Sequence, residues 1–166
     1  MFRLPFRVLA LALFAVCGAL LAFGLYLQHV KGIEPCPMCI MQRYALLACG
    51  LIGLVAGLHA PGRGGVRAYS GLLALTALAG GGVAARQSWI QWFPPAVSEC
   101  GPGLEYMLDS FPLSSALPMI FRGAGDCSLV DWTFLGLSIA NWSFVTFATI
   151  LAALAAYLLQ RDKNRP

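Results

Sequence analysis

The stretch VLALALFAVCGALLAFGLYL, residues 8–27, contains no charged side chain. About 20 helical residues of this kind cross the roughly 30 Å hydrocarbon core of a bilayer. Within that core the backbone can satisfy its hydrogen bonds only as a helix or a closed barrel, because lipid offers no partners. The stretch is also longer than the apolar region of a cleaved signal peptide, which is usually about 7–15 residues. We therefore expect a retained membrane helix at residues 8–27.

Three further stretches can cross a bilayer, at residues 39–58, 68–85 and 138–159, and the middle one is somewhat short and rich in small residues. Of the 166 residues, 59% are hydrophobic and 11% are charged, and the mean hydropathy is +0.75. A soluble domain carries about 25% charged residues. So small a soluble core could not bury this surplus of apolar side chains. The sequence predicts an all-α membrane protein, a single bundle of four transmembrane helices over residues 1–166.

Basic residues gather on one side of the predicted bundle. The N-terminus, the short connection between the second and third spans, and the C-terminal tail share that side and hold seven of the eleven Lys and Arg residues. The opposite side, formed by loops at residues 28–38 and 86–137, holds six of the seven acidic residues. Because cytoplasmic loops carry the excess of Lys and Arg, both termini are predicted to be cytoplasmic and both loops extracytoplasmic.

The second outer loop is long enough to contain structure of its own, and loops of this length are often functional. Its apolar residues at spacings i, i+3, i+4 and i+7 are Leu104, Met107, Leu108 and Phe111. This spacing is typical of one apolar helix face. We expect a short helix here, lying in the membrane interface and ending at Pro112.

The six cysteines fall into two groups. Cys17 and Cys49 lie within the first and second spans, where we expect them to be small buried hydrophobes. The other four belong to the outer side, where disulfides form and persist. They are Cys36, Cys39, Cys100 and Cys127. Four cysteines permit three pairings in two bonds, and the C-x-x-C spacing of the first two favours bonds 36–39 and 100–127.

The motif Cys36-Pro37-Met38-Cys39 opens the second helix. Pro37 suits the first helical turn, so Cys39 would lie where free N–H groups and the helix dipole favour a thiolate. Arg43 follows four residues later, one turn deeper on the same face. An arginine inside a membrane span is unfavourable and is rarely placed without a partner. Together, the Cys39 thiolate and the Arg43 guanidinium indicate a site for an anionic or electron-accepting ligand.

Simpler interpretations of these residues stay open. The C-x-x-C pair could be a structural disulfide or a soft-metal site, although no second pair or nearby His completes a set of four zinc ligands. We predict no metal site. The pair Cys100 and Cys127, taken alone, would be a structural disulfide. Arg43 could extend its charged head to the membrane interface.

Taken together, these features resemble the DsbB family, the bacterial inner-membrane disulfide oxidases. The likeness covers nearly the whole chain: four spans, cytoplasmic termini, a C-x-x-C pair that opens the second helix, an arginine four residues later, and a cysteine pair in the second outer loop. The stretches that carry it are Tyr26 to Arg43, Phe93 to Cys100, and Gly125 to Gly136. A lone C-x-x-C motif would be weak support, whereas this combination is specific.

The resemblance implies a quinone-dependent protein-disulfide oxidoreductase of the bacterial inner membrane, with its active cysteines on the periplasmic side. A reduced DsbA-like protein would pass its electrons to the loop pair, with Cys100 forming the mixed disulfide with the partner and Cys127 completing the pair. The electrons would then reach Cys36 and Cys39. From Cys39 they would pass to a membrane quinone, ubiquinone or menaquinone, held near Arg43. DsbA is itself a strong oxidant, so its reoxidation needs an acceptor of high potential.

Other functions fit parts of the sequence. A paralogue dedicated to another partner would use the same residues. A vitamin K epoxide reductase-like enzyme usually places its C-x-x-C pair near the last helix of the bundle rather than the second. A non-catalytic membrane protein or transporter with two structural disulfides is the alternative from another class. Against this last alternative, the predicted spans contain no acidic residue and a single charge, Arg43, beside the C-x-x-C motif.

Two features of the third span receive no assigned role. The run Gly80-Gly81-Gly82 would allow helix backbones to approach closely. Gln87, near the outer end of the span, suits either a contact with a quinone head-group or an anchor in the interface.

Overall fold

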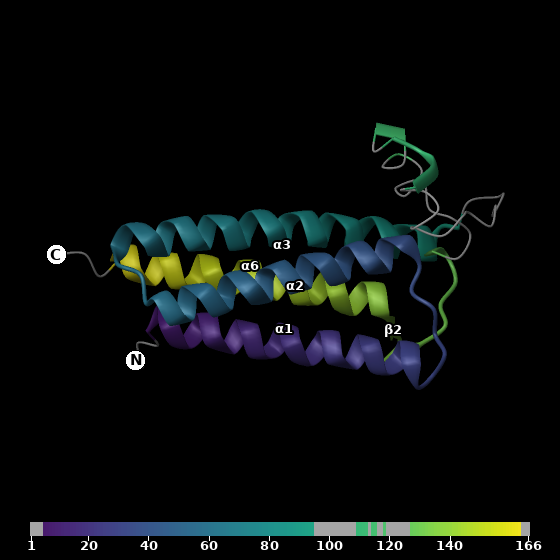
Figure 1. Cartoon of the computed structure of the whole chain (residues 1–166), viewed down its shortest axis with the longest axis horizontal. Helices are drawn as coiled ribbons and strands as arrows, with labels where there is room; N and C mark the ends of the chain where they lie inside the picture. The colour runs from purple at the N-terminus through teal and green to yellow at the C-terminus, as the bar shows by residue number, and fades with distance from the viewer. Residues whose placement is uncertain (1–4, 95–108, 113, 116–117, 119–126, 164–166) are drawn as a thin grey trace.

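Four long helices frame the structure, a computed structural model that describes residues 5–94, 109–112, 114–115, 118 and 127–163. The elements in chain order are α1 (Phe6–His29), α2 (Pro37–His59), α3 (Arg63–Trp92), β1 (Thr133–Phe134), β2 (Leu137–Ser138) and α6 (Ile139–Lys163). Each of the four helices contains a segment long and apolar enough to cross a membrane. They lie side by side, with the start of α1 and the end of α6 at the same end of the bundle (Figure 1). The predicted four-helix membrane fold is confirmed.

The helices extend beyond the predicted spans. The largest difference is in α3, which is 30 residues long where the sequence predicted a short span at residues 68–85. The added turns carry Arg63, Arg67 and Arg86. Arginine is a good helix former, so the helix extends beyond both ends of the apolar stretch. Hydropathy marks the part of a helix that suits lipid. It gives no signal for helical turns that extend beyond either end of that part.

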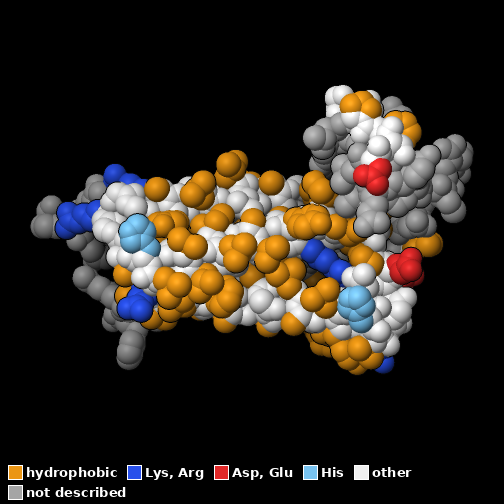
Figure 2. All heavy atoms as spheres, viewed as in Figure 1, with side chains coloured by type: hydrophobic (Ala, Val, Ile, Leu, Met, Phe, Trp, Pro, Cys, Tyr) orange, Lys and Arg blue, Asp and Glu red, His pale blue; other side chains and the backbone are white. Residues whose placement is uncertain are grey.

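The bundle surface is apolar along most of its length. Figure 2 shows hydrophobic side chains over the middle of the bundle, with Lys and Arg side chains gathered at the end where α1 begins and acidic side chains toward the opposite end. We call the end where α1 begins the terminal end. We call the opposite end, where α2 begins directly after Cys36, the cysteine end. Large hydrophobic side chains such as Leu51 and Leu75 are at least half exposed. Lipid rather than water suits such a surface.

Each helix packs on its neighbour in the chain, α1 on α2, α2 on α3, and α3 on α6. The central core contains the fully buried side chains of Phe147, Cys17 and Cys49. The prediction that both cysteines are buried among apolar side chains is confirmed. At the terminal end, Phe6 of α1 meets Tyr157 of α6, with ring centroids 5.5 Å apart.

Gly80 lies where α3 packs against both α2 and α6. A Cβ atom at Gly80 would lie 2.7 Å from Ala45 Cβ and would also overlap the ring of Phe147. Gly82 has nothing within 4 Å of such an atom. The glycine run of the third span therefore permits close helix packing at Gly80, whereas Gly82 contributes nothing to it.

We expect Gly80→Ala to lower the thermal unfolding midpoint of the detergent-solubilised protein, because overpacking of this kind destabilises by about 1–3 kcal/mol. The matched variant Gly82→Ala should leave the midpoint unchanged or slightly higher, since alanine favours the helix. Circular dichroism during heating measures both midpoints. Equal midpoints for the two variants would contradict this packing account.

A short hairpin connects the loop to α6. Strands β1 and β2 pair antiparallel, with Thr133 opposite Ser138. Between them, Leu135 and Gly136 have positive φ angles of 52° and 78°, as a two-residue type I′ turn requires. The indole nitrogen of Trp142 donates to the Phe134 carbonyl oxygen at 3.1 Å. This hairpin was not predicted, and it fixes an aromatic segment beside the helices at the cysteine end.

Two predictions lie outside the described residues. The interfacial helix was placed on Leu104, Met107 and Leu108, and Cys100 belongs to the same undescribed stretch. Both stay predictions. Phe111, the last residue of the predicted apolar face, is described and is exposed.

Candidate functional site

The C-x-x-C motif lies at the start of α2. Cys36 is the N-cap residue, Pro37 occupies the first helical position, and Cys39 falls in the first turn. Cys36 Sγ accepts the backbone N–H of Cys39 at 3.4 Å, which satisfies one of the free donors of the helix start. The two Sγ atoms lie 2.9 Å apart. The local fold therefore holds both sulfurs in contact, and closing a bond between them requires only a small movement.

Cys127 lies against the same motif. Its side chain is fully buried in a cluster with Cys36, Val83 and Ile90. Hydrogen bonding with Cys127 and then with Cys39, together with burial, raises the pKa of the Cys36 thiol. Cys36 thus contacts a cysteine on each side, one from the loop and one from α2. The structure brings together three of the four predicted site cysteines, and Cys100 lies outside the described residues.

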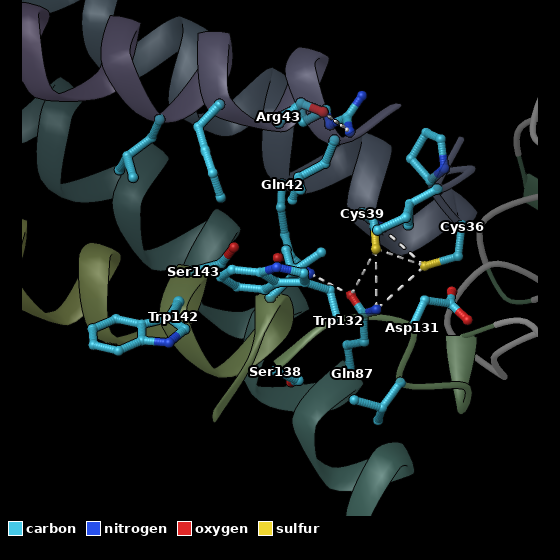
Figure 3. A pocket seen from close by; sticks show the side chains of 18 of the residues that line it. Cys36, Cys39, Gln42, Arg43, Gln87, Asp131, Trp132, Ser138, Trp142 and Ser143 are labelled. Atoms are coloured by element: carbon cyan, nitrogen blue, oxygen red, sulfur yellow. Dashed lines mark hydrogen bonds between the residues drawn. The ribbon is translucent and has the colours of Figure 1, made fainter. Parts of the chain in front are cut away.

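Two buried glutamines lie beside the cysteine pair, and Gln87 points at its sulfurs (Figure 3). Gln87 Nε2 of α3 donates to Cys36 Sγ at 3.3 Å and to Cys39 Sγ at 3.2 Å. Gln42 Nε2 of α2 donates to Gln87 Oε1 at 2.6 Å. Both glutamine side chains are only 2% exposed. From the sequence alone Gln87 has no assigned role and Gln42 is not predicted, although an uncharged polar residue one turn after Cys39 is an available signal.

Arg43 turns toward α1. Its Nη2 donates to the Gly24 carbonyl oxygen at 3.0 Å, and its Nη1 donates to Gln28 Oε1. Both acceptors are neutral, so these contacts orient the guanidinium without cancelling its charge. The sequence had predicted that an arginine inside a span needs a partner, and the partners are these two oxygens of α1. Arg43 and Cys39 line the same cavity.

The cavity at the cysteine end has a volume of about 580 Å³. That size is in the usual range for small-molecule and cofactor sites, roughly 300–1,000 Å³. Its walls come from α1, α2, α3, α6 and the segment before α6, and they include the aromatic side chains of Phe23, Trp132, Phe134 and Trp142. Phe23 and Trp132 meet edge to face at 5.5 Å between centroids. The walls suit an apolar ring, and the polar groups of Cys39, Gln87 and Arg43 suit a polar or anionic edge on it.

Comparison with known proteins gives consistent matches. A family model described as "Disulfide bond formation protein DsbB" matches residues 6–157. "Disulfide bond formation protein B" of Azoarcus sp. (strain BH72) is 72% identical over 153 residues, which is 92% of each chain. The protein of the same name from Aromatoleum aromaticum is 64% identical over 163 residues, 98% of each chain. That of Polaromonas sp. (strain JS666 / ATCC BAA-500) is 59% identical, over 89% of this chain and 86% of the relative.

Proposed function

The chain belongs to the DsbB family of disulfide bond formation proteins, and we propose that it carries electrons through two cysteine pairs to a quinone bound beside Cys39 and Arg43. It is a multi-pass inner-membrane oxidoreductase that generates disulfides by reoxidising DsbA, and its family uses quinone. The sequence-based predictions of fold, enzyme class and membrane location agree with this membership. The alternative of a non-catalytic transporter is set aside by it.

The observation that carries the proposal is the sequence of contacts among the three described cysteines of the site, from Cys127 to Cys36 to Cys39. Cys127 packs with Cys36 in one buried cluster, and Cys36 Sγ lies 2.9 Å from Cys39 Sγ. In thiol–disulfide exchange a thiolate attacks one sulfur of a disulfide and the other sulfur leaves as a thiolate. The order favours attack by Cys127 on Cys36, which releases Cys39 on the cavity side.

The electrons then move through two thiol–disulfide exchanges in turn. A DsbA thiolate attacks Cys100 of the loop disulfide, and Cys127 leaves as a thiolate. The second DsbA thiolate resolves the mixed disulfide, so DsbA leaves oxidised and Cys100 becomes a thiolate. Cys127 attacks Cys36 and frees Cys39. Cys100 then attacks Cys127, which restores the loop disulfide and leaves Cys36 and Cys39 as a dithiol that holds two electrons.

The residues around the cavity fit a quinone. A bound quinone supplies an acceptor for two electrons and two protons. The aromatic side chains of Trp132, Phe134 and Trp142 provide flat apolar walls. Cys39 presents its sulfur to the cavity, and Arg43 supplies a fixed positive charge beside it. We propose ubiquinone or menaquinone from the bilayer as the acceptor, and a DsbA-like thioredoxin-fold protein as the donor on the periplasmic side.

A trapped disulfide tests the proposed route. In the double variant Cys39→Ala/Cys100→Ala, mild oxidation should join Cys36 to Cys127, because the two side chains pack in one buried cluster. Mass mapping without reductant identifies the bond. In the matched variant Cys36→Ala/Cys100→Ala, Cys39 and Cys127 should join much less readily. Equal yields from both variants, or no bond in the first, would contradict the sequence of contacts from Cys127 to Cys36 to Cys39 on which the route depends.

A further inference from the structure

We propose that Gln42 is a positioning residue for the redox pair: it fixes the amide of Gln87 so that its N–H donors face both sulfurs, and this stabilises the reduced form of the pair. The inference rests on the proposed function, in which Cys36 and Cys39 take up and release electrons. Two buried uncharged residues, Gln42 and Gln87, then help to set the direction of electron flow.

The geometry is a short chain of hydrogen bonds between two helices. Gln87 comes from the face of α3 that also carries Val83 and Ile90, and this face packs on the cysteine cluster. Its Nε2 reaches both sulfurs, at 3.3 Å from Cys36 and 3.2 Å from Cys39. Figure 3 shows the amide pointing between the two sulfurs, with its oxygen turned to Gln42.

Gln42 decides which end of the Gln87 amide meets the sulfurs. The oxygen and nitrogen ends of an amide have nearly the same shape, so neighbouring donors and acceptors determine its orientation. The contact of 2.6 Å from Gln42 Nε2 holds the Gln87 oxygen away from the sulfurs. The opposite orientation would offer Cys39 an acceptor, and the thiol would then keep its proton. In the orientation seen, a 3.7 Å contact from Cys39 Sγ to Gln87 Oε1 is longer than the 3.2 Å contact that Nε2 makes.

These hydrogen bonds act differently on the two redox states. A thiolate is a much stronger acceptor than a disulfide sulfur, because hydrogen bonds to charged groups are the strong ones. Bonds from Gln87 therefore strengthen when the pair is reduced. Stabilising the reduced form makes a disulfide a stronger oxidant. The loop pair then passes electrons more readily to the pair on α2, and Cys39 is held as the thiolate at the edge of the cavity.

Arg43 has a different part. Its guanidinium donates to Gly24 and Gln28 of α1, whereas the Gln87 amide donates to the sulfurs themselves. Removing the amide and removing the guanidinium should therefore have separable effects. The amide changes the equilibrium of the pair whether or not a quinone is bound.

The test measures the equilibrium of the pair on α2 with glutathione. Full-length protein in detergent, carrying Cys100→Ala/Cys127→Ala so that one redox pair remains, is incubated in buffers of defined glutathione ratio without quinone. The reaction is disulfide plus two reduced glutathione giving dithiol plus oxidised glutathione. Alkylation and mass mapping give the ratio of dithiol to disulfide in the parent, in Gln87→Met, in Gln42→Met, and in Gln42→Met/Gln87→Met.

We expect Gln87→Met to shift the equilibrium about tenfold toward the disulfide, which corresponds to a potential about 30 mV lower. Gln42→Met should shift it in the same direction by less. Because Gln42 acts through Gln87, the double variant should match Gln87→Met alone. Thr76→Val removes another hydrogen-bonding side chain from α3, one that bonds to the Leu72 carbonyl oxygen far from the sulfurs in sequence, and it should leave the ratio unchanged.

The outcomes separate the two proposals. Additive shifts in the double variant, or no shift with Gln42→Met, would overturn the positioning role, and no shift with Gln87→Met would overturn the whole inference. A parent that forms no disulfide between Cys36 and Cys39 would overturn the proposed function as well. If a methionine variant folds poorly, Gln87→Glu keeps the shape and replaces the donors by acceptors. It should shift the equilibrium at least as far as Gln87→Met and slow the alkylation of reduced Cys39 at neutral pH.

Discussion

Replacing Cys39 by alanine should reduce steady-state quinone reduction by a factor on the order of 10⁴ or more, as loss of an essential catalytic nucleophile does in other enzymes. The variant removes the proposed final electron donor from the cavity wall and leaves Cys36 and Cys127 in one buried cluster. Electrons from the partner can then reach the loop pair and stop there. Absorbance of the quinone, followed with a reduced DsbA-like protein as donor, measures the rate.

Two further variants give this prediction its controls. Cys49→Ala removes a fully buried thiol from the same helix and should retain the rate of the parent. Cys39→Ala should still form a mixed disulfide with the partner, whereas Cys100→Ala should lose it. Near-normal turnover in Cys39→Ala would contradict the placement of the final electron donor. Near-normal turnover in a variant without Cys100 and Cys127 would show that the loop pair is a structural disulfide.

Replacing Arg43 by alanine should have the second largest effect, a loss of quinone reduction. Removing one preorganised donor to a developing negative charge typically costs about 2.7–4 kcal/mol in the transition state, and partial access of water should reduce this figure here. The guanidinium keeps its charge at any working pH and offers a planar set of donors. It acts where charge appears, on the Cys39 thiolate and the acceptor oxygen, so it should favour reduction more than binding.

The Arg43 contacts with α1 shape the controls. Arg43→Lys keeps the charge without the planar donors and should restore part of the rate, whereas Arg43→Gln should not. Gln28→Leu removes one acceptor of the guanidinium but keeps the charge, so a small effect is expected there. Disulfide content checks folding. If Arg43→Ala reduces quinone with the Michaelis constant and rate of the parent, Arg43 is an interfacial anchor and its assignment to the quinone site is wrong.

The four helices could be predicted from the sequence because the bilayer imposes both length and composition on them. Residues 8–27 satisfy both requirements. The ends of α3 could not be predicted in this way, because the turns with Arg63 and Arg86 form a helix without being apolar. The hairpin could not be predicted for a different reason. Leu135 adopts a positive φ, which leucine rarely does, so Gly136 was the only residue that indicated a turn.

The candidate site was predictable where its residues are close in sequence. Cys36, Cys39 and Arg43 share one helix start, and helical spacing places them near one another. The contacts of Cys127 with Cys36 and of Gln87 with the sulfurs join residues that are far apart in the chain. A single sequence does not show which distant residues make such contacts. It shows only that polar side chains occur in apolar surroundings. Gln42 was overlooked because an uncharged residue in a span is less conspicuous than an arginine.

The most direct test of the central claim is the electron stoichiometry of the detergent-solubilised protein without oxygen. Oxidised full-length protein, with ubiquinone or menaquinone in excess, is mixed with increasing amounts of a reduced DsbA-like partner, and quinol and partner disulfide are measured together. The account predicts one quinol for each partner disulfide, and no quinol from Cys36→Ala/Cys39→Ala. Partner oxidation without quinol, or quinol formation that persists in that double variant, would contradict it.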